Sequence, residues 1–155
     1  MSTAPATLRN LASPEAIKLL GLGFWPIAIH PAGAPLDGDR VAAGKEPIGS
    51  KWGVERWTIG ELNATFKRNP GAGVGICLGP GRGPNGLNLI DTEIDGEDGW
   101  AALAELFGGE VPGTMGWAST RGGHHLFTLD DNSYKRLCDV VAKFGVEGKG
   151  SARGA

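Results

Sequence analysis

GLNLIDTEIDGEDGW, residues 86–100, contains an apolar run that leads directly into three acids at every second position. Because side chains alternate between the two faces of a strand, this pattern predicts a strand with Asp91, Glu93 and Asp95 on one face. Three carboxylates on one face of one strand repel each other at pH 7. We therefore expect a group nearby that offsets this repulsion.

A divalent cation would offset it. Hard cations such as Mg²⁺ bind oxygen ligands and are often held by one or two carboxylates plus substrate phosphates. Asp91 and Glu93 directly follow the apolar residues of the strand and are the predicted metal pair. The alternative is a solvated acidic turn, and we interpret residues 95–98 in that way, because Asp-Gly favours turns and acids favour the first turn of a helix.

Length and composition restrict the class of protein. The chain has 155 residues, enough to bury a core, and we expect a single domain over residues 1–155. Its two cysteines are far apart and fit neither a zinc site nor a disulfide framework, which favours a reducing, cytoplasmic setting. No apolar run approaches the length of a membrane span, so no membrane partner is expected.

The charges are distributed unevenly, although the formal net charge is only −2. Residues 1–90 hold nine Lys or Arg against six acids, residues 91–131 one against nine, and residues 132–155 five against two. An acidic middle between mildly basic ends suits a metal site in a phosphate-binding groove. Ordinary surface patchiness gives the same counts, so charge does not decide between these interpretations.

Helices and strands alternate along the chain, which predicts a mixed α+β (α/β) fold. Start and stop signals predict helices near residues 13–21, 58–67, 98–107 and 132–144. Strands are predicted near residues 24–33, 73–79 and 86–95, with two short ones within residues 118–129. The Asn-Gly turn at residues 85–86 predicts that residues 73–79 form a β-hairpin with the acidic strand.

A second informative stretch is TMGWASTRGGHHLFTL, residues 114–129. Its glycine pair at 122–123 permits close approach of the backbone to a ligand. The hydroxyls of Ser119 and Thr120 and the guanidinium of Arg121 suit the oxygens of a triphosphate. A glycine hairpin with a packed histidine would account for the same residues. The stretch alone does not favour either a triphosphate site or such a hairpin.

The adjacent histidines of that stretch cannot both line one site. Because neighbours on a strand face opposite ways, one of His124 and His125 is predicted to be a bystander. Lys45, in a Gly- and Pro-rich loop, is either solvated or a point-charge phosphate binder. The adjacent histidines also depart from the His-hydrophobic-His motif of replication nucleases, and no P-loop motif occurs.

From about residue 17 to residue 150 the chain resembles the bifunctional primase/polymerase N-terminal (Prim-Pol) domains of the archaeo-eukaryotic primase superfamily. The resemblance rests on GFWPIAIHP, on Lys45-x-Pro47 with Trp52, on residues 73–78, on LNLIDTE and on TRGGHHLF. Each element is short, and their order along the chain is what the resemblance depends on. It implies an α+β catalytic core with an RRM-like sheet flanked by helices.

The resemblance also implies roles for particular residues. In that family the acid pair binds the catalytic metals, which implies that Asp91 and Glu93 bind Mg²⁺ or Mn²⁺. The histidine of the family's Gly-Gly-x-His segment contacts the incoming triphosphate, which maps to His125 and leaves His124 as the variable position. The family's third acid follows the next helix, and Glu147 is its natural match here. The resemblance further implies that Ser119, Thr120, Arg121 and Lys45 bind the triphosphate.

The implied function is template-dependent nucleotidyl transfer by a two-metal mechanism, in primer synthesis for a phage or plasmid-like element. NTPs or dNTPs, a single-stranded DNA template and a replicative helicase domain are the implied partners. The chain ends before the family's apolar-Pro-Pro-Ser segment, so we expect a domain truncated at its C-terminus or a degenerate relative. Two further functions stay open: a non-catalytic nucleotide- or nucleic-acid-binding domain of a replication protein, and a metal-dependent nuclease or phosphohydrolase.

Overall fold

The computed structural model describes residues 12–118 and 122–144. It divides into two compact units, the first up to Cys77 and the second from Leu78 onward. Within the described residues it contains four α-helices and two small antiparallel sheets, which confirms the predicted α+β class. The expectations of a single domain over residues 1–155 and of its truncation stay predictions. None of the helices in the described ranges combines the length and apolar character needed to cross a membrane.

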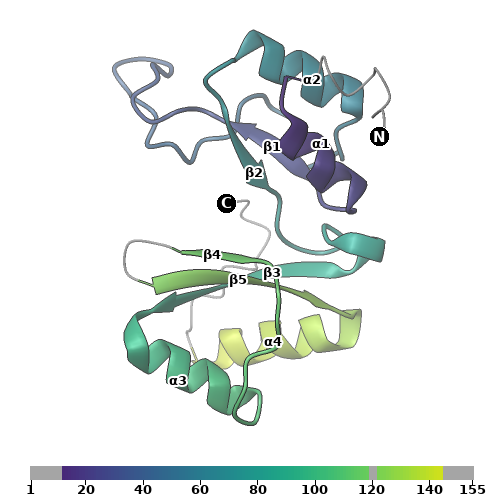
Figure 1. Ribbon diagram of the computed structural model, residues 1–155, viewed down its shortest axis with the longest axis vertical. Coiled ribbons are helices and arrows are strands. Elements are labelled where there is room, and N and C mark those ends of the chain that lie inside the picture. The colour runs from purple at the N-terminus through teal and green to yellow at the C-terminus, as the bar shows by residue number, and fades with distance from the viewer. Residues whose placement is uncertain (1–11, 119–121, 145–155) are drawn as a thin grey trace, which may run out of the picture. The chain divides into compact units, whose positions relative to one another are not determined.

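Two helices of the first unit begin at the capping residues that the sequence predicts (Figure 1). The side chain of Ser13 accepts a hydrogen bond from the backbone of Ala16 at the start of α1, Pro14–Gly21. Thr58 and Glu61 form a capping box at the start of α2, Ile59–Arg68. These side chains pair backbone N–H groups that the first turn of a helix leaves without partners.

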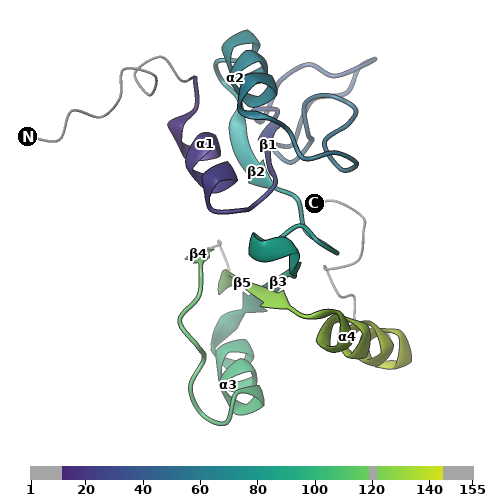
Figure 2. The same ribbon diagram turned by 90° about the vertical axis from the view of Figure 1, so that its right-hand side faces the viewer.

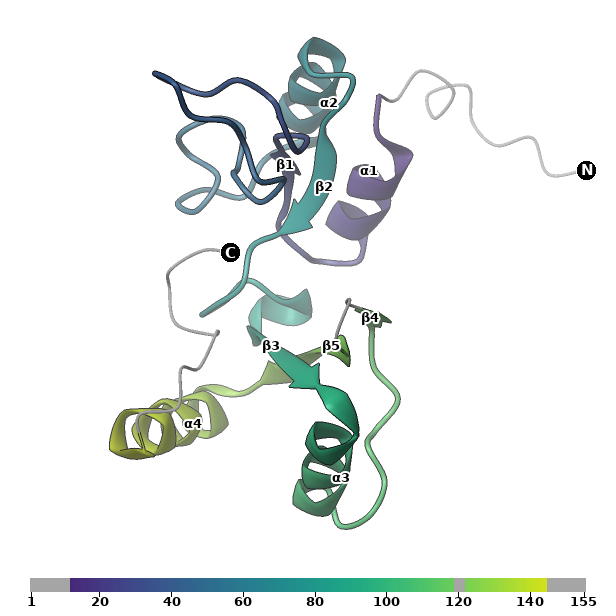
Figure 3. The same cartoon turned by 90° about the vertical axis from the view of Figure 1, so that its left-hand side faces the viewer.

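The two helices pack against a two-stranded antiparallel sheet (Figure 3). Its strands are β1, Pro26–Ile29, and β2, Gly73–Ile76. Gly75 permits this pairing to pack closely, because a Cβ there would lie 2.9 Å from Cδ1 of Ile29. The core of the unit is apolar, and one of its clusters comprises Ala16, Ala28, Trp57, Leu62 and Phe66.

This pairing shows that the predicted hairpin between residues 73–79 and the acidic strand is wrong. β2 pairs with β1, and within the described residues the acidic strand meets that segment through an isolated bridge between Gly79 and Leu89. The Asn85-Gly86 turn does form, as part of the short 3₁₀ helix Pro84–Gly86, and Asn85 has a φ of 57°. The turn signal therefore located a turn correctly but did not identify the pairing partner.

The second unit is built on a three-stranded antiparallel sheet in the order β3-β5-β4. The acidic strand β3, Asn88–Asp95, pairs with the central strand β5, Gly122–Leu129, and β5 pairs with β4, Gly116–Ala118. Two strands were predicted within residues 118–129; two strands do form in this stretch, but β4 begins two residues before the predicted range.

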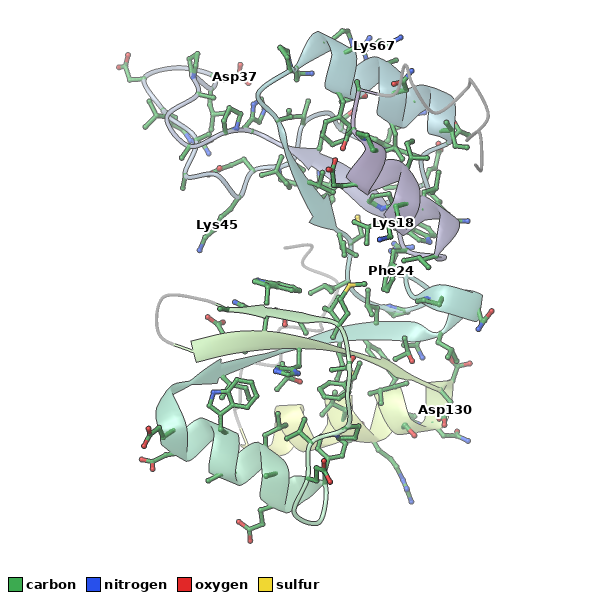
Figure 4. The ribbon with its side chains drawn as sticks, in the orientation of Figure 1. Lys18, Phe24, Asp37, Lys45, Lys67 and Asp130 are labelled. Atoms are coloured by element: carbon green, nitrogen blue, oxygen red, sulfur yellow. The ribbon has the colours of Figure 1, made fainter. Side chains whose placement is uncertain are left out.

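Two helices, α3, Gly96–Leu106, and α4, Asp131–Phe144, both lie on one side of this sheet (Figures 1 and 2). Asp130 lies where β5 meets α4, and its carboxylate accepts a hydrogen bond from the backbone of Ser133 (Figure 4). The side of the sheet that carries the helices is called the helix face below, and the opposite side the acid face.

Candidate active site

The acid pair lies on the side of the sheet away from the helices. Ile94 faces α3, because a Cβ on Gly99 of that helix would lie 2.9 Å from its Cγ2. Alternation along β3 therefore places Thr92 on the helix face and Asp91 and Glu93 on the acid face. The side chain of Asp95 lies outside the described residues.

The register between β3 and β5 decides which histidine joins the acids. Glu93 is directly opposite His124, and Thr92 is directly opposite His125. Residues directly opposite each other in an antiparallel pair share a face. His124 therefore lies on the acid face, and its Nδ1 is 2.8 Å from Oδ2 of Asp91.

Asp91 is a buried carboxylate with one oxygen unsatisfied. Its side chain is only 9% exposed, and His124 occupies Oδ2. The other oxygen, Oδ1, is buried and has no hydrogen-bond partner among the described residues. Leaving a buried carboxylate oxygen unpaired is costly, so this oxygen is suited to a cation that would pair with it.

These residues fit a hard divalent cation that shares its coordination with substrate. Within residues 12–118 and 122–144 no group of three or more His, Cys, Asp or Glu is arranged to hold a metal ion. Mg²⁺ at phosphoryl-transfer sites is usually held by one or two carboxylates plus substrate phosphates. Asp91 and Glu93 supply that number of carboxylates on one face, and the predicted third acid, Glu147, lies outside the described residues.

The structure does not bring His125 together with the acids. Its ring makes an edge-on contact with Trp100 of α3 at 4.8 Å and stacks at 6.4 Å with Phe127, so it belongs to an aromatic cluster on the helix face. Its Nδ1 is buried without a hydrogen-bond partner among the described residues. Of the two neighbours, the one that the family resemblance leaves as variable, His124, is the one beside the acids.

A tryptophan completes a row of side chains across the acid face. Trp117 of β4 is directly opposite His124, which is in turn directly opposite Glu93. The indole and imidazole rings are stacked at 4.8 Å with an interplanar angle of 13°. The sequence analysis missed both Trp117 and the placement of His124. Only the strand register aligns these residues with the acids, and the register cannot be read from the sequence.

Four further residues are predicted triphosphate ligands: Ser119, Thr120, Arg121 and Lys45. Ser119, Thr120 and Arg121 lie outside the described residues. Lys45 belongs to the first unit, where its side chain extends outward from the loop between β1 and α2 (Figure 4). Its role as a phosphate binder stays a prediction.

The comparisons with known proteins give one match. The model of the family described as bifunctional DNA primase/polymerase, N-terminal (Prim-Pol) matches residues 16–152, a range that contains the acid pair and both histidines. Searches of the curated proteins and of the solved structures found no match. Because the family model covers most of its length, the chain belongs to the Prim-Pol family, which implies a primase/polymerase-type nucleotidyltransferase role at the family level.

Proposed function

We propose that this chain catalyses template-dependent nucleotidyl transfer, in which a DNA or RNA strand is lengthened from NTPs or dNTPs during replication of a phage or plasmid-like element. The family supports the reaction class. The observation that carries the proposal is the buried carboxylate of Asp91, with one oxygen held by His124 and the other unpaired. Glu93 lies on the same face, directly opposite that histidine.

In the reaction a 3′-hydroxyl oxygen forms a bond to the α-phosphorus of the incoming nucleotide, and the bond to pyrophosphate breaks. Two divalent ions, when bound, activate the hydroxyl and neutralise charge on the leaving group. Asp91 and Glu93 would hold Mg²⁺ or Mn²⁺ together with triphosphate oxygens, and Glu147 is the proposed third acid. Ser119, Thr120, Arg121 and Lys45 stay proposed triphosphate ligands.

His124 has two tasks in this proposal. By donating from Nδ1 to Oδ2 of Asp91 it fixes the carboxylate so that Oδ1 is available to a cation. When both nitrogens of an imidazole carry protons, Nε2 can donate a second hydrogen bond, and such a donor would suit the oxygens of a triphosphate. We therefore assign to His124 the triphosphate contact that the family resemblance gives to His125.

The test is incorporation of labelled NTPs and dNTPs on a primed single-stranded template with Mg²⁺ or Mn²⁺. Wild type is compared with the double variant Asp91→Asn, Glu93→Gln, which removes both charges with little change of shape. Glu105→Gln, an exposed acid on α3, is the matched control. We expect incorporation by wild type and by the control, and none by the double variant.

Two other results would replace the proposal. Metal-dependent nucleotide binding by wild type without any strand extension would indicate a non-catalytic binding domain. Shortening of an end-labelled primer or template, added in a parallel assay, that the double variant abolishes would indicate a nuclease that uses the same acids.

A further inference from the structure

On the edge strand β4, large and small side chains are placed in an unusual way. Gly116 and Ala118 are small and lie on the helix face, whereas Trp117, between them in the strand, projects from the acid face. The indole is 48% exposed, although burying such a ring in a core is strongly favourable. The sheet therefore presents its largest aromatic side chain on the face that holds the carboxylates and not on the face that packs against helices.

One side of this indole is supported by the imidazole of His124. Its ring lies nearly parallel to the imidazole of His124, at 4.8 Å and 13°, and that imidazole is held in turn by Asp91 at 2.8 Å. An aromatic ring with one side supported and a half-exposed surface loses little freedom when a further ring stacks on it. This arrangement gives a preformed flat surface beside the site.

The distance from this surface to the acids matches a nucleotide. Glu93 and Trp117 are two strand positions apart across the sheet, which corresponds to about 10 Å. A nucleotide with its phosphates at the acids extends its base over such a distance. Every base has an apolar face that can stack on an aromatic ring, which makes such a contact tolerant of base identity.

We propose that Trp117 is a stacking platform for the base of the nucleotide whose triphosphate binds at Asp91, Glu93 and His124. This inference rests on the proposed function, since it needs the phosphates to bind at the acids. It adds a base-contacting residue that binds purine and pyrimidine nucleotides alike.

The test separates the base from the phosphates. Binding of ATP, dCTP and inorganic tripolyphosphate is measured by calorimetry with Mn²⁺, for wild type, Trp117→Ala and Trp117→Phe. We expect Trp117→Ala to weaken the binding of both nucleotides about tenfold, because stacking of a base on one aromatic ring contributes roughly a factor of ten in affinity. The affinity for tripolyphosphate should stay within about twofold of wild type, because tripolyphosphate has no base. Trp117→Phe should recover most of the lost affinity. Phe107→Ala, which removes a half-exposed aromatic from the end of α3, is the control and should leave all three affinities unchanged.

Three results would overturn the inference. Equal losses for nucleotide and tripolyphosphate would mean that Trp117 acts only by holding His124. Unchanged nucleotide affinity with weaker binding of a single-stranded oligonucleotide would mean that the indole contacts a template base instead. Failure of wild type to bind even tripolyphosphate with Mn²⁺ would overturn the proposed function too, whereas the first two results would leave it standing.

Discussion

The Nδ1 atom of His124 lies 2.8 Å from Oδ2 of Asp91, although the two residues are not directly opposite each other. The partner of His124 in the ladder is Glu93, and the partner of Asp91 is Leu126. The imidazole therefore reaches diagonally across the β3–β5 pair toward the earlier acid. One histidine thus orients the carboxylate whose second oxygen is left for a ligand.

This diagonal contact predicts that replacing His124 by leucine lowers activity much more than the same substitution at the adjacent His125. His124→Leu removes the group that holds Asp91, and we expect incorporation to fall about 10- to 100-fold, the usual effect of losing a residue that orients a metal ligand. His125→Leu replaces a ring whose buried Nδ1 has no hydrogen-bond partner among the described residues, so activity should stay within about threefold of wild type. Steady-state incorporation rates of the two variants check this.

The opposite ranking would show that the family position, His125, contacts the triphosphate and that the acid-face histidine is the bystander. Thermal unfolding of both variants controls for loss of fold. A variant whose Tm falls below the assay temperature is then replaced by the corresponding His→Gln substitution.

Metal binding at Asp91 predicts a stability change that does not depend on activity. An ion that binds only the folded state raises the free energy of unfolding, by about 2.7 kcal/mol at a concentration 100 times its dissociation constant. We expect Mn²⁺ with tripolyphosphate to raise the Tm of wild type and EDTA to reverse the change. Asp91→Asn should show no such increase, whereas Glu105→Gln should behave as wild type. An equal increase in all three proteins would place the ion elsewhere.

Local features of the fold could be predicted from the sequence because they depend on neighbouring residues. Ser13 and Thr58 start helices through hydrogen bonds to backbone groups three residues away, and both starts are confirmed. The acidic strand is likewise recognisable from alternation alone. These signals require no knowledge of distant parts of the chain.

Strand pairing could not be predicted in the same way. β3 pairs with β5, which begins 27 residues after β3 ends, and the Asn85-Gly86 turn between β2 and β3 carries no information about that partner. The face occupied by each histidine depends on the register of this distant pairing, and a slip of one residue would exchange His124 and His125. The sequence could therefore state that one histidine faces the acids but not which one.

The capping box of α2 predicts a dependence of stability on acid. The pKa of Glu61 lies below its ordinary value of 4.5, chiefly because its carboxylate accepts a hydrogen bond from the backbone N–H of Thr58 and also one from the Thr58 hydroxyl. A carboxyl whose pKa is lower in the folded state stabilises the fold above its unfolded pKa, and this contribution is lost as the pH falls through the folded pKa.

We therefore expect wild type to be more stable than Glu61→Gln at pH 7 and the difference to shrink as the pH falls below about 4.5. Urea unfolding of both proteins between pH 7 and pH 3 measures it. A difference that stays constant over this range would show that the charge of Glu61 contributes nothing to the cap.

At Gly116, β4 lies too close to β5 to admit a side chain, and this close approach predicts a sensitive position. A Cβ at Gly116 would overlap the backbone carbonyl oxygen of His124, which cannot move without breaking the ladder. Gly116→Ala should therefore displace β4, cost about 1–3 kcal/mol of stability as overpacking does, and separate Trp117 from the imidazole on which it stacks.

Gly113→Ala is the matched control, because a Cβ there meets nothing within 4 Å. We expect the first variant to lower Tm, nucleotide affinity and incorporation together and the second to leave all three near wild type. If the two variants behaved alike, the close pairing of β4 with β5 would not be what holds Trp117 beside His124.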